Sequence, residues 1–314
     1  MGEERQPGEA GRAGSPLGAS VSVVVPAFNA ERTIGRVVRA LLAQEPRPDE
    51  IIVVDDGSTD RTAEIAAGLG VRVITARGVG SAGGARNLGW DEAEGDVVLF
   101  LDSDAIPAPG FMAGLARALA EFPGAIIACA RTFTAETSWG WVAYLQFETP
   151  YLPLGEPRRT SFVSSYCMAV PRRAPLRWDE SYGGEDGIFC VDALDAGLDL
   201  VFDPRFQAVN DHDRQTFAGL RRQQGRLAYG LARVGAVQRE GRHKRILSRI
   251  PIHYFVLARL VPIHRRLGAY PALRATFWRL LPLMVVAEWT LGASALRHVL
   301  KRPPLRGQSV TGFR

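Results

Sequence analysis

Two aspartates separated by one residue, Asp102 and Asp104, are the side chains best suited to chemistry in this chain. They follow five apolar residues, Val97 to Leu101, a pattern typical of a strand buried on both faces of a parallel sheet. Ligands bind at the carboxyl ends of such strands. Two carboxylates on one face of an extended segment suit a hard divalent cation that also holds a diphosphate. The alternative is a strand that ends in an Asp-capped turn.

Alternating strands and helices are expected to position these aspartates. Apolar runs predict four strands, at residues 21–25, 51–54, 71–75 and 97–101. Helices are expected between them, with apolar residues at helical spacing over 34–42 and further helices from about Arg61 and from Ala85. Ser58 or Thr59 is expected to cap the second of these helices. This alternation predicts a parallel, doubly wound α/β sheet.

Length and composition limit the class of protein. The 314 residues, 46% hydrophobic and 23% charged, suffice for one large α/β domain with an appendage. The three cysteines lack the spacing of metal ligands, so we expect buried thiols in a reducing compartment. Residues 1–18 lack the apolar stretch of a signal peptide and are expected to be a disordered leader.

Charge is distributed unevenly along the chain. Residues 1–213 carry 18 basic and 31 acidic residues, whereas the stretch from Arg214 onward carries 20 basic and 2 acidic ones. A basic segment beside long apolar runs favours an anionic membrane surface over nucleic acid. We therefore expect no nucleic-acid partner. The expected location is the cytoplasmic face of the cell membrane, peripheral or single-span, or otherwise the cytoplasm.

Two apolar stretches lie in this basic segment. Residues 252–263 are too few to cross a bilayer, whereas 277–296 are long enough but contain Glu288, which is unfavourable in hydrocarbon. Residues that suit a membrane interface flank or lie within the longer stretch: Trp278, Trp289, Arg297, Lys301 and Arg302. Three arrangements stay open, namely in-plane or re-entrant membrane association, a spanning helix, and soluble helical packing or dimerisation.

Glu185 and Asp186 form a second acidic pair. They follow two glycines and precede apolar residues at helical spacing, which predicts a helix N-terminus at the mouth of a cleft. The alternative is an acidic N-terminal cap. The spacing Gly78-x-Gly80-x-x-Gly83 does not indicate a dinucleotide site, because that motif belongs in the first strand–helix turn. It fits a loop over a phosphate-bearing ligand or simply a loop.

Several short motifs together resemble the family 2 glycosyltransferases of the GT-A fold. They are Pro26–Asn29, Val54–Ser58, Ala85–Asn87, Asp102–Asp104, Trp178–Asp186 and Val209–His212. The resemblance implies a GT-A (Rossmann-like), mostly parallel sheet flanked by helices, with a C-terminal helical, membrane-associating segment. We expect a leader at 1–18, a GT-A domain at 19–230 and a basic helical segment at 231–314.

The resemblance also implies a nucleotide-sugar donor site. Its residues in this chain are Pro26, Phe28, Asn29, Asp55, Asp56, Arg86, Asp102 and Ser103. A carboxylate can accept the N–H of uracil or guanine, an aromatic ring can pack near the base, and a guanidinium suits phosphate oxygens. The alternatives are a capped turn at residues 55–58 and an ordinary surface arginine at position 86.

Metal and catalytic residues follow from the same resemblance. Asp104 would bind Mn²⁺ or Mg²⁺ directly, Asp102 would contact the ribose or a metal-bound water, and His212 would add a ligand that favours Mn²⁺. A surface histidine is the alternative at position 212. Asp186, beside Glu185, would be the catalytic base, kept ionised by the helix dipole. A phosphate acceptor would need no base.

These expectations combine into one function. The chain would move a sugar from a UDP- or GDP-linked donor to a hydroxyl or phosphate acceptor. The reaction would depend on a metal ion and would invert the anomeric centre, although retention stays open. The acceptor would be a lipid-linked glycan, a polyprenyl phosphate or a glycolipid precursor. Aromatic residues between Trp139 and Tyr151 fit acceptor stacking or, as we favour, core packing. The alternative is a catalytically silent, sugar-nucleotide-binding membrane scaffold.

Overall fold

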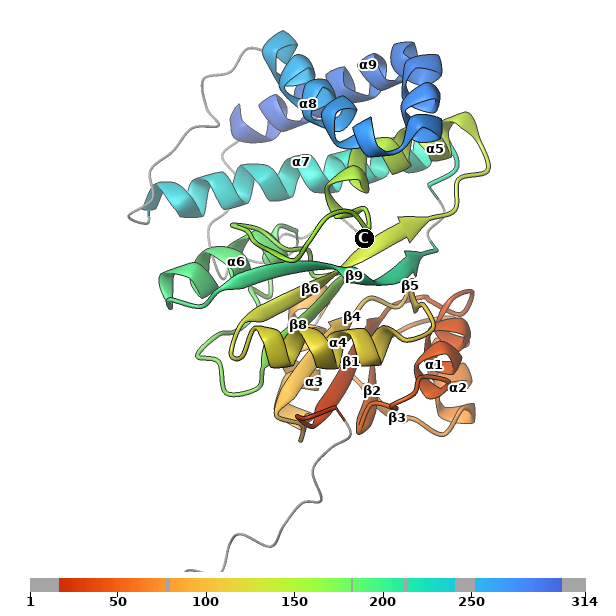
Figure 1. The fold of residues 1–314 in the computed structure, drawn as a ribbon, viewed down its shortest axis with the longest axis vertical. Coiled ribbons are helices and arrows are strands. Elements are labelled where there is room, and N and C mark those ends of the chain that lie inside the picture. Colours follow the sequence, from red (N-terminus) through yellow and green to blue (C-terminus); the bar gives the residue numbers. More distant parts are fainter. Residues whose placement is uncertain (1–16, 77–79, 182, 212–213, 241–251, 301–314) are drawn as a thin grey trace, which may run out of the picture.

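The computed structural model describes residues 17–76, 80–181, 183–211, 214–240 and 252–300. One β-sheet carries helices on both faces, and a separate group of helices packs together above it in the view of Figure 1. The strands are β1 (Val21–Ala27), β2 (Glu50–Asp55), β3 (Arg72–Thr75), β4 (Val97–Leu101), β5 (Ala105–Pro107), β6 (Ile126–Phe133), β7 (Arg158–Arg159), β8 (Cys167–Pro171) and β9 (Leu200–Asn210). The helices are α1 (Ile34–Leu42), α2 (Thr62–Gly68), α3 (Ala82–Glu92), α4 (Phe111–Glu121), α5 (Ser138–Phe147), α6 (Glu185–Asp195), α7 (Phe217–Glu240), α8 (Ile252–Arg266) and α9 (Pro271–Leu300), with short 3-10 turns η1 (Thr149–Tyr151) and η2 (Leu267–Ala269).

The sheet has a parallel half and a mixed half. Its order is β3-β2-β1-β4-β8-β6-β9-β5, with β7 paired to β9. The first four of these strands are parallel, as the strand–helix alternation predicts, whereas β8 runs antiparallel to both of its neighbours. The chain steps from β1 outward to β3 and then returns to β4 on the other side of β1. This reversal makes the carboxyl ends of β1 and β4 the expected ligand crevice.

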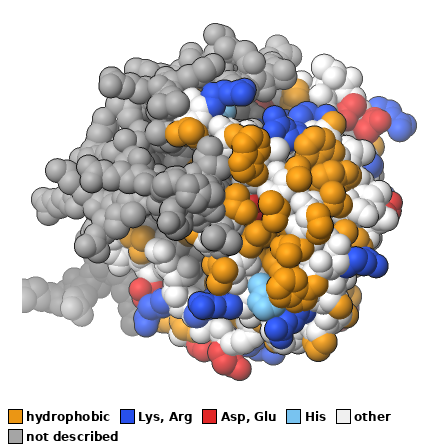
Figure 2. Space-filling model, turned by 90° about the horizontal axis from the view of Figure 1, so that it is seen from above, with side chains coloured by type: hydrophobic (Ala, Val, Ile, Leu, Met, Phe, Trp, Pro, Cys, Tyr) orange, Lys and Arg blue, Asp and Glu red, His pale blue; other side chains and the backbone are white. Residues whose placement is uncertain are grey.

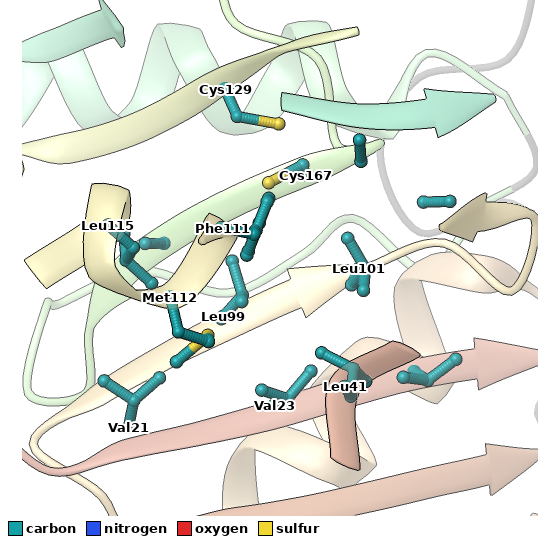
Figure 3. Close-up of a cluster of buried hydrophobic side chains, with 14 of the residues drawn as sticks. Val21, Val23, Leu41, Leu99, Leu101, Phe111, Met112, Leu115, Cys129 and Cys167 are labelled. Carbon is teal, nitrogen blue, oxygen red and sulfur yellow. The ribbon is translucent and has the colours of Figure 1, made fainter. Parts of the chain in front are cut away.

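Alternating side chains of the central strands build two cores, one on each face of the sheet. On one face, strand residues Val23 and Leu99 meet Met112 and Leu115 of α4 and Leu41 of α1, as Figure 3 shows. On the other face, Phe100 packs against Trp178, whose ring stacks on Phe189 at 4.1 Å. The three cysteines are free and buried, which confirms the expectation of buried thiols.

A third core holds α5, α7, α8 and α9 together. Its buried members include Tyr144 of α5, Leu220 of α7, Leu260 of α8 and Met284 of α9. Trp139, Trp141 and Phe147 pack against it, so the aromatic residues of α5 serve core packing, as favoured from the sequence. The expected domain boundary at residues 230/231 falls inside α7, which runs unbroken from Phe217 to Glu240.

Helix α9 contains the longer apolar stretch. Residues Pro271–His298 are long and apolar enough to cross a membrane by length and composition alone, although 39% of the most apolar window is buried inside the protein. Glu288 is fully buried, and its Oε2 accepts a hydrogen bond from Arg259 Nε of α8 at 2.7 Å. The acid therefore faces its own protein rather than the outside of the helix.

Candidate functional site

The turns that follow β1 and β2 are held together by Asn29. Its backbone N–H donates to Ser58 Oγ, and its Oδ1 accepts from the Thr59 N–H, both at 2.9 Å. Its backbone has φ +50°, a left-handed conformation that Asn tolerates better than most residues. The expectation that Ser58 or Thr59 caps the next helix is wrong, because α2 begins at Thr62, whose N–H donates to Asp60.

The expected donor-binding residues at these turns differ in accessibility. Pro26 lies within β1 and is buried, and Asp55 is buried with only 4% of its surface exposed. Phe28 exposes 51% of its surface, and the half-buried Asp56 accepts a hydrogen bond from the Gly80 N–H at 2.9 Å. Phe28, Asn29 and, in part, Asp56 are therefore the solvent-accessible members of this set.

Glycines bring α3 very close to its neighbours. A Cβ on Gly83 would lie 2.1 Å from the carbonyl oxygen of Asp179, and one on Gly89 would lie 2.3 Å from a Val24 methyl. No larger residue fits at either position without displacement. Gly83, the last glycine of the Gly78-x-Gly80-x-x-Gly83 motif, thus allows close packing of α3. Gly78, the first glycine of that motif, lies outside the described residues.

This close packing buries Arg86 of α3 at the centre of the site. Its Nη2 donates to Asp102 Oδ1 at 2.8 Å and to Ser165 Oγ at 3.2 Å, and its Nη1 lies 3.3 Å from Glu185 Oε1. The guanidinium also lies over the Trp178 ring, 4.8 Å from its centroid. Burial opposes the charge, but Asp102 and Glu185 outweigh it and raise the pKa of Arg86. The sequence did not predict that Arg86 would join these two acidic motifs.

Asp102 and Asp104 lie on a turn, not on an extended segment as expected. The Asp102 carbonyl accepts a hydrogen bond from the Ala105 N–H at 2.9 Å, so the chain reverses around Ser103. All three residues are half-buried. The turn results because β4 ends at Leu101 and the chain immediately crosses to β5.

The segment after β9 is tied to this turn. The Asp211 N–H donates to the Asp104 carbonyl at 2.9 Å, and the Asp211 carboxylate forms ion pairs with Arg32, at 3.0 Å, and with Arg36. His212, the expected third metal ligand, follows directly but lies outside the described residues. Its predicted role stays a prediction.

Carboxylates outnumber cations in the cleft. Burial, followed by the nearby charge of Asp102, raises the pKa of Asp104 from 3.8 to about 6, although Arg214 opposes this rise. The cluster has five carboxylates and three guanidinium groups, from Asp102, Asp104, Glu148, Glu185, Asp186, Arg86, Arg131 and Arg214. Within this set the carboxylates exceed the guanidinium groups, which favours the binding of a cation.

Sequence reasoning missed Glu148 and Arg131, which lie beneath this turn. Glu148 is fully buried and pairs with Arg131, and Arg214 lies 3.7 Å from its other oxygen. The Arg131 guanidinium stacks over the Tyr151 ring at 4.1 Å. In the sequence, Glu148 stands at the end of an aromatic stretch with no spacing signal, so only the fold reveals this pair.

Asp186 occupies the first turn of α6, as predicted from the two preceding glycines. Gly184 has φ +81°, in the left-handed region that favours glycine, and the Asp186 carboxylate accepts the Gly187 N–H at 2.8 Å. The expectation that the helix dipole keeps Asp186 ionised is wrong, because the pKa of this carboxyl is raised and not lowered. Burial and the charge of Glu185 together raise its pKa from 3.8 to about 7.

Helix α7 fixes the position of α6. Arg233 is fully buried, and it donates to the Gly183 carbonyl at 2.7 Å and to Asp179 Oδ1 at 2.9 Å. A Cβ on Gly230 would lie 3.0 Å from the Gly184 Cα, so the two backbones almost touch. An arginine among the apolar positions of an amphipathic helix was the only sequence signal for this contact.

Comparison with known proteins finds similarity in sequence over the first part of the chain. The model of the family described as glycosyl transferase family 2 matches residues 22–176. Glycosyltransferase GlyG of Streptococcus pneumoniae is 38% identical over 91 residues, covering 27% of this chain and 30% of that protein. The amylovoran biosynthesis glycosyltransferase AmsB of Erwinia amylovora is 38% identical over 92 residues, 27% of this chain and 31% of that protein. The chain thus matches about a third of the length of these curated relatives.

Among solved structures, the similarity extends over most of the chain. The mannosyltransferase PcManGT from Pyrobaculum calidifontis, solved with GDP-Man and Mn²⁺, has a TM-score of 0.58 at 18% sequence identity. The match covers 90% of this chain and 88% of that one. At this level of identity the likeness concerns the fold, including the helices beyond residue 176.

Proposed function

Because the chain belongs to glycosyl transferase family 2, we propose that it transfers a sugar from a nucleoside-diphosphate donor to an acceptor hydroxyl or phosphate. The observation that supports this proposal most is the position of Arg86, which donates a hydrogen bond to Asp102 and forms an ion pair with Glu185. Donor-side and acceptor-side motifs, distant in sequence, thereby contact the same arginine. The GT-A fold expected from the sequence is the fold of the mannosyltransferase.

The donor nucleotide is proposed to bind at the turns after β1 and β2. Phe28 presents an exposed ring and Asp56 a carboxylate, which suit the face and the N–H edge of uracil or guanine. The role of Asn29 is proposed to be indirect, because its side chain already ties the two turns together. UDP and GDP are the proposed donor nucleotides, because uracil and guanine both present an N–H that this carboxylate can accept.

A divalent cation is proposed to be held by Asp104, with Asp102 nearby. The excess of carboxylates around the Asp102–Asp104 turn and the raised pKa of Asp104 fit such an ion. Within the described ranges, no three His, Cys, Asp or Glu side chains are grouped closely enough to hold a metal. The remaining ligands would therefore come from the diphosphate, from water or from His212. A bound Mn²⁺ or Mg²⁺ would neutralise the diphosphate as it leaves.

Asp186 is proposed to be the catalytic base for a hydroxyl acceptor. It would take the proton of the acceptor O–H while that oxygen forms a bond to the anomeric carbon. The bond from this carbon to the phosphate oxygen breaks, and its electron pair leaves with the nucleoside diphosphate. A single displacement of this kind inverts the anomeric centre. Arg86 would hold Glu185 beside the base and provide positive charge to the departing phosphate.

The acceptor is proposed to be lipid-linked, such as a lipid-linked glycan, a polyprenyl phosphate or a glycolipid precursor. Support comes from the basic, apolar C-terminal segment, which suits an anionic membrane at the cytoplasmic face. The similar protein AmsB is named for amylovoran biosynthesis. The acceptor is the part of the proposal that depends most on the C-terminal helices.

Thermal unfolding in the presence of nucleotides tests the donor and metal sites. We expect either UDP or GDP to raise the unfolding midpoint in the presence of Mn²⁺, by on the order of 5 °C at about 100 times Kd. Asp104→Ala should abolish the metal-dependent part of this shift. The control Asp91→Asn alters an exposed carboxylate of α3 and should leave the shift intact.

Sugar transfer is then measured with Asp186→Asn. This variant should still be stabilised by nucleotide and Mn²⁺ but should lose turnover with a hydroxyl acceptor by at least about 1,000-fold. Full turnover in Asp186→Asn would refute its role as base. Nucleotide binding without transfer in the native chain would instead favour a silent scaffold. No metal-dependent stabilisation by any nucleotide would refute the assigned donor and metal site.

A further inference from the structure

The outer face of α9 carries an apolar stripe that no other described helix covers. Its residues are Trp278, Pro282, Val285, Val286 and Trp289, all exposed, with 55% and 57% of the two tryptophan surfaces accessible. Their spacing of i, i+4, i+7, i+8 and i+11 places them on one side of the helix. The opposite side, which includes Phe277, Met284 and Ala287, is buried in the third core. Both faces of α9 are therefore apolar, but only one of them packs against other described helices.

Exposed arginines lie on both α8 and α9, and those of α9 flank this stripe by helical spacing. The exposed arginines of α8 and α9 are Arg265, Arg266, Arg274, Arg279 and Arg297. Over residues 252–300 the sequence has a single acid, Glu288, and it is buried. Figure 2 shows this face of the molecule, where a band of hydrophobic side chains runs between groups of Lys and Arg with few acidic side chains nearby. A surface of this kind is complementary to an anionic lipid headgroup layer above hydrocarbon.

Polar contacts on the inner side of α9 argue against a crossing of the bilayer. Glu288 bonds Arg259, and the fully buried Gln224 of α7 donates to the Ala287 carbonyl at 2.8 Å. Thr290 Oγ1 donates to Gln224 Oε1 at 2.8 Å. A spanning α9 would separate these groups and place a carboxylate in hydrocarbon, which is strongly unfavourable. Lying in the plane keeps every one of these bonds.

We propose that the apolar stripe of α9, with its bordering arginines, docks in the plane of an anionic lipid surface without crossing it. The two tryptophans enter the headgroup region and the arginines contact lipid phosphates, while the inner face stays packed on α5, α7 and α8. This docking surface is separate from the cleft, so it does not depend on the proposed sugar transfer.

Vesicle co-sedimentation of the full chain tests the proposal. We expect binding to phosphatidylcholine vesicles that contain phosphatidylglycerol, little binding to phosphatidylcholine alone, and release by high salt. The double variant Trp278→Ser/Trp289→Ser should weaken binding at least about tenfold. Arg265→Gln/Arg266→Gln should weaken it to a similar extent, by about tenfold. Leu194→Ser, which removes an exposed apolar side chain of α6, is the matched control and should bind normally.

Other outcomes would overturn the proposal in distinct ways. Salt-resistant binding to both kinds of vesicle would indicate insertion across the bilayer. A dimer in solution that the tryptophan double variant abolishes would identify a second copy as the partner of the stripe. Absence of vesicle binding, while UDP or GDP with Mn²⁺ still stabilises the protein, would refute docking and leave the transfer proposal intact. Unchanged thermal unfolding of the variants without ligand establishes that they fold.

Discussion

Asp186 lies where burial and its neighbour Glu185 both oppose a negative charge, while Arg86 opposes them only in part. The residue that is proposed to accept a proton is thus held in an environment that makes it a better base than an ordinary aspartate. A carboxylate whose pKa lies near neutrality can both take and release a proton under working conditions. This has consequences for rate and for stability, and the two can be measured separately.

Turnover with a hydroxyl acceptor should depend on the ionisation of Asp186. Because its pKa is about 7 and only the ionised form accepts a proton, kcat/KM should fall about tenfold for each pH unit below this value. The measurement is a pH profile of kcat/KM with nucleotide binding recorded in parallel. A profile without this decline, at unchanged donor affinity, would contradict the assignment or indicate a phosphate acceptor.

The contribution of Asp186 to the free energy of unfolding should fall as the pH rises, whereas that of an ion-paired carboxylate grows. The pKa of Asp186 is raised from 3.8 to about 7 on folding, so the folded state binds the proton more tightly. Its contribution to the free energy of unfolding therefore falls as pH rises from 3.8 to about 7 and is constant above.

Asp186→Asn, which stays neutral, should consequently unfold at a higher temperature than the native chain. The difference should be small near pH 4, should grow up to about pH 7 and should reach on the order of 5 °C. Thermal unfolding across this range measures it, with Asp91→Asn as the control for an exposed carboxylate. An equal midpoint at every pH would show that Asp186 is not destabilised by its surroundings.

At the scale of secondary-structure elements, α7 determines where α6 lies. The backbones of Gly230 and Gly184 nearly touch, and Arg233 bonds the Gly183 carbonyl beside them. Since Asp186 is two residues beyond Gly184, a small movement of this contact displaces the proposed base. Misplacement of a catalytic group by about 1 Å can lower a rate about 100-fold.

Gly230→Ala tests this arrangement. Its new Cβ would lie 3.0 Å from the Gly184 Cα, so α6 must shift by a few tenths of an ångström. We expect kcat to fall about tenfold with donor affinity unchanged. Gly225→Ala, in the same helix with open space around its Cβ, is the control and should retain activity while stabilising the helix by about 1 kcal/mol. Equal activity of both variants would refute the positioning role.

Strands and helices of the parallel half could be predicted from the sequence because their signals are local. The apolar runs of β1, β2 and β4 and the helical spacing of α1 need no knowledge of distant residues. The Asp102–Asp104 turn could not be predicted, because its shape depends on the crossing of the chain to β5. Contacts such as Arg131 with Glu148, or Arg233 with Asp179, arise only when separate elements pack, so no local pattern contains them.

At the scale of the whole molecule, buried polar contacts join α8 and α9 to α5, whose last residues lead to the proposed site. Arg259 of α8 bonds Glu288 of α9 and donates to the Gln146 carbonyl of α5 at 3.3 Å. Glu148, which pairs with Arg131 beneath the cleft, stands two residues after Gln146. The contacts of α8 and α9 thus reach an α5 residue that lies two positions before Glu148 in the chain.

Arg259→Ala should therefore weaken the whole fold. It leaves the carboxylate of Glu288 buried without its cation, so we expect a loss of about 3–5 kcal/mol in the free energy of unfolding, measured by urea denaturation. Arg265→Ala, which removes an exposed arginine of the same helix, should change it by less than about 0.5 kcal/mol. The pairing would be dispensable if both variants had the same midpoint.

Helix α7 makes buried polar contacts with two different elements, one on each of two opposite sides. Gln224 bonds α9, and Arg233, nine residues later, bonds the segment before α6; nine residues at about 100° each bring the two side chains to opposite sides of the helix. One inserted or deleted residue between them would rotate one contact by about 100° relative to the other. The length of this stretch is therefore fixed by both neighbours, so homologous chains that keep both contacts should vary in length in their loops and never here.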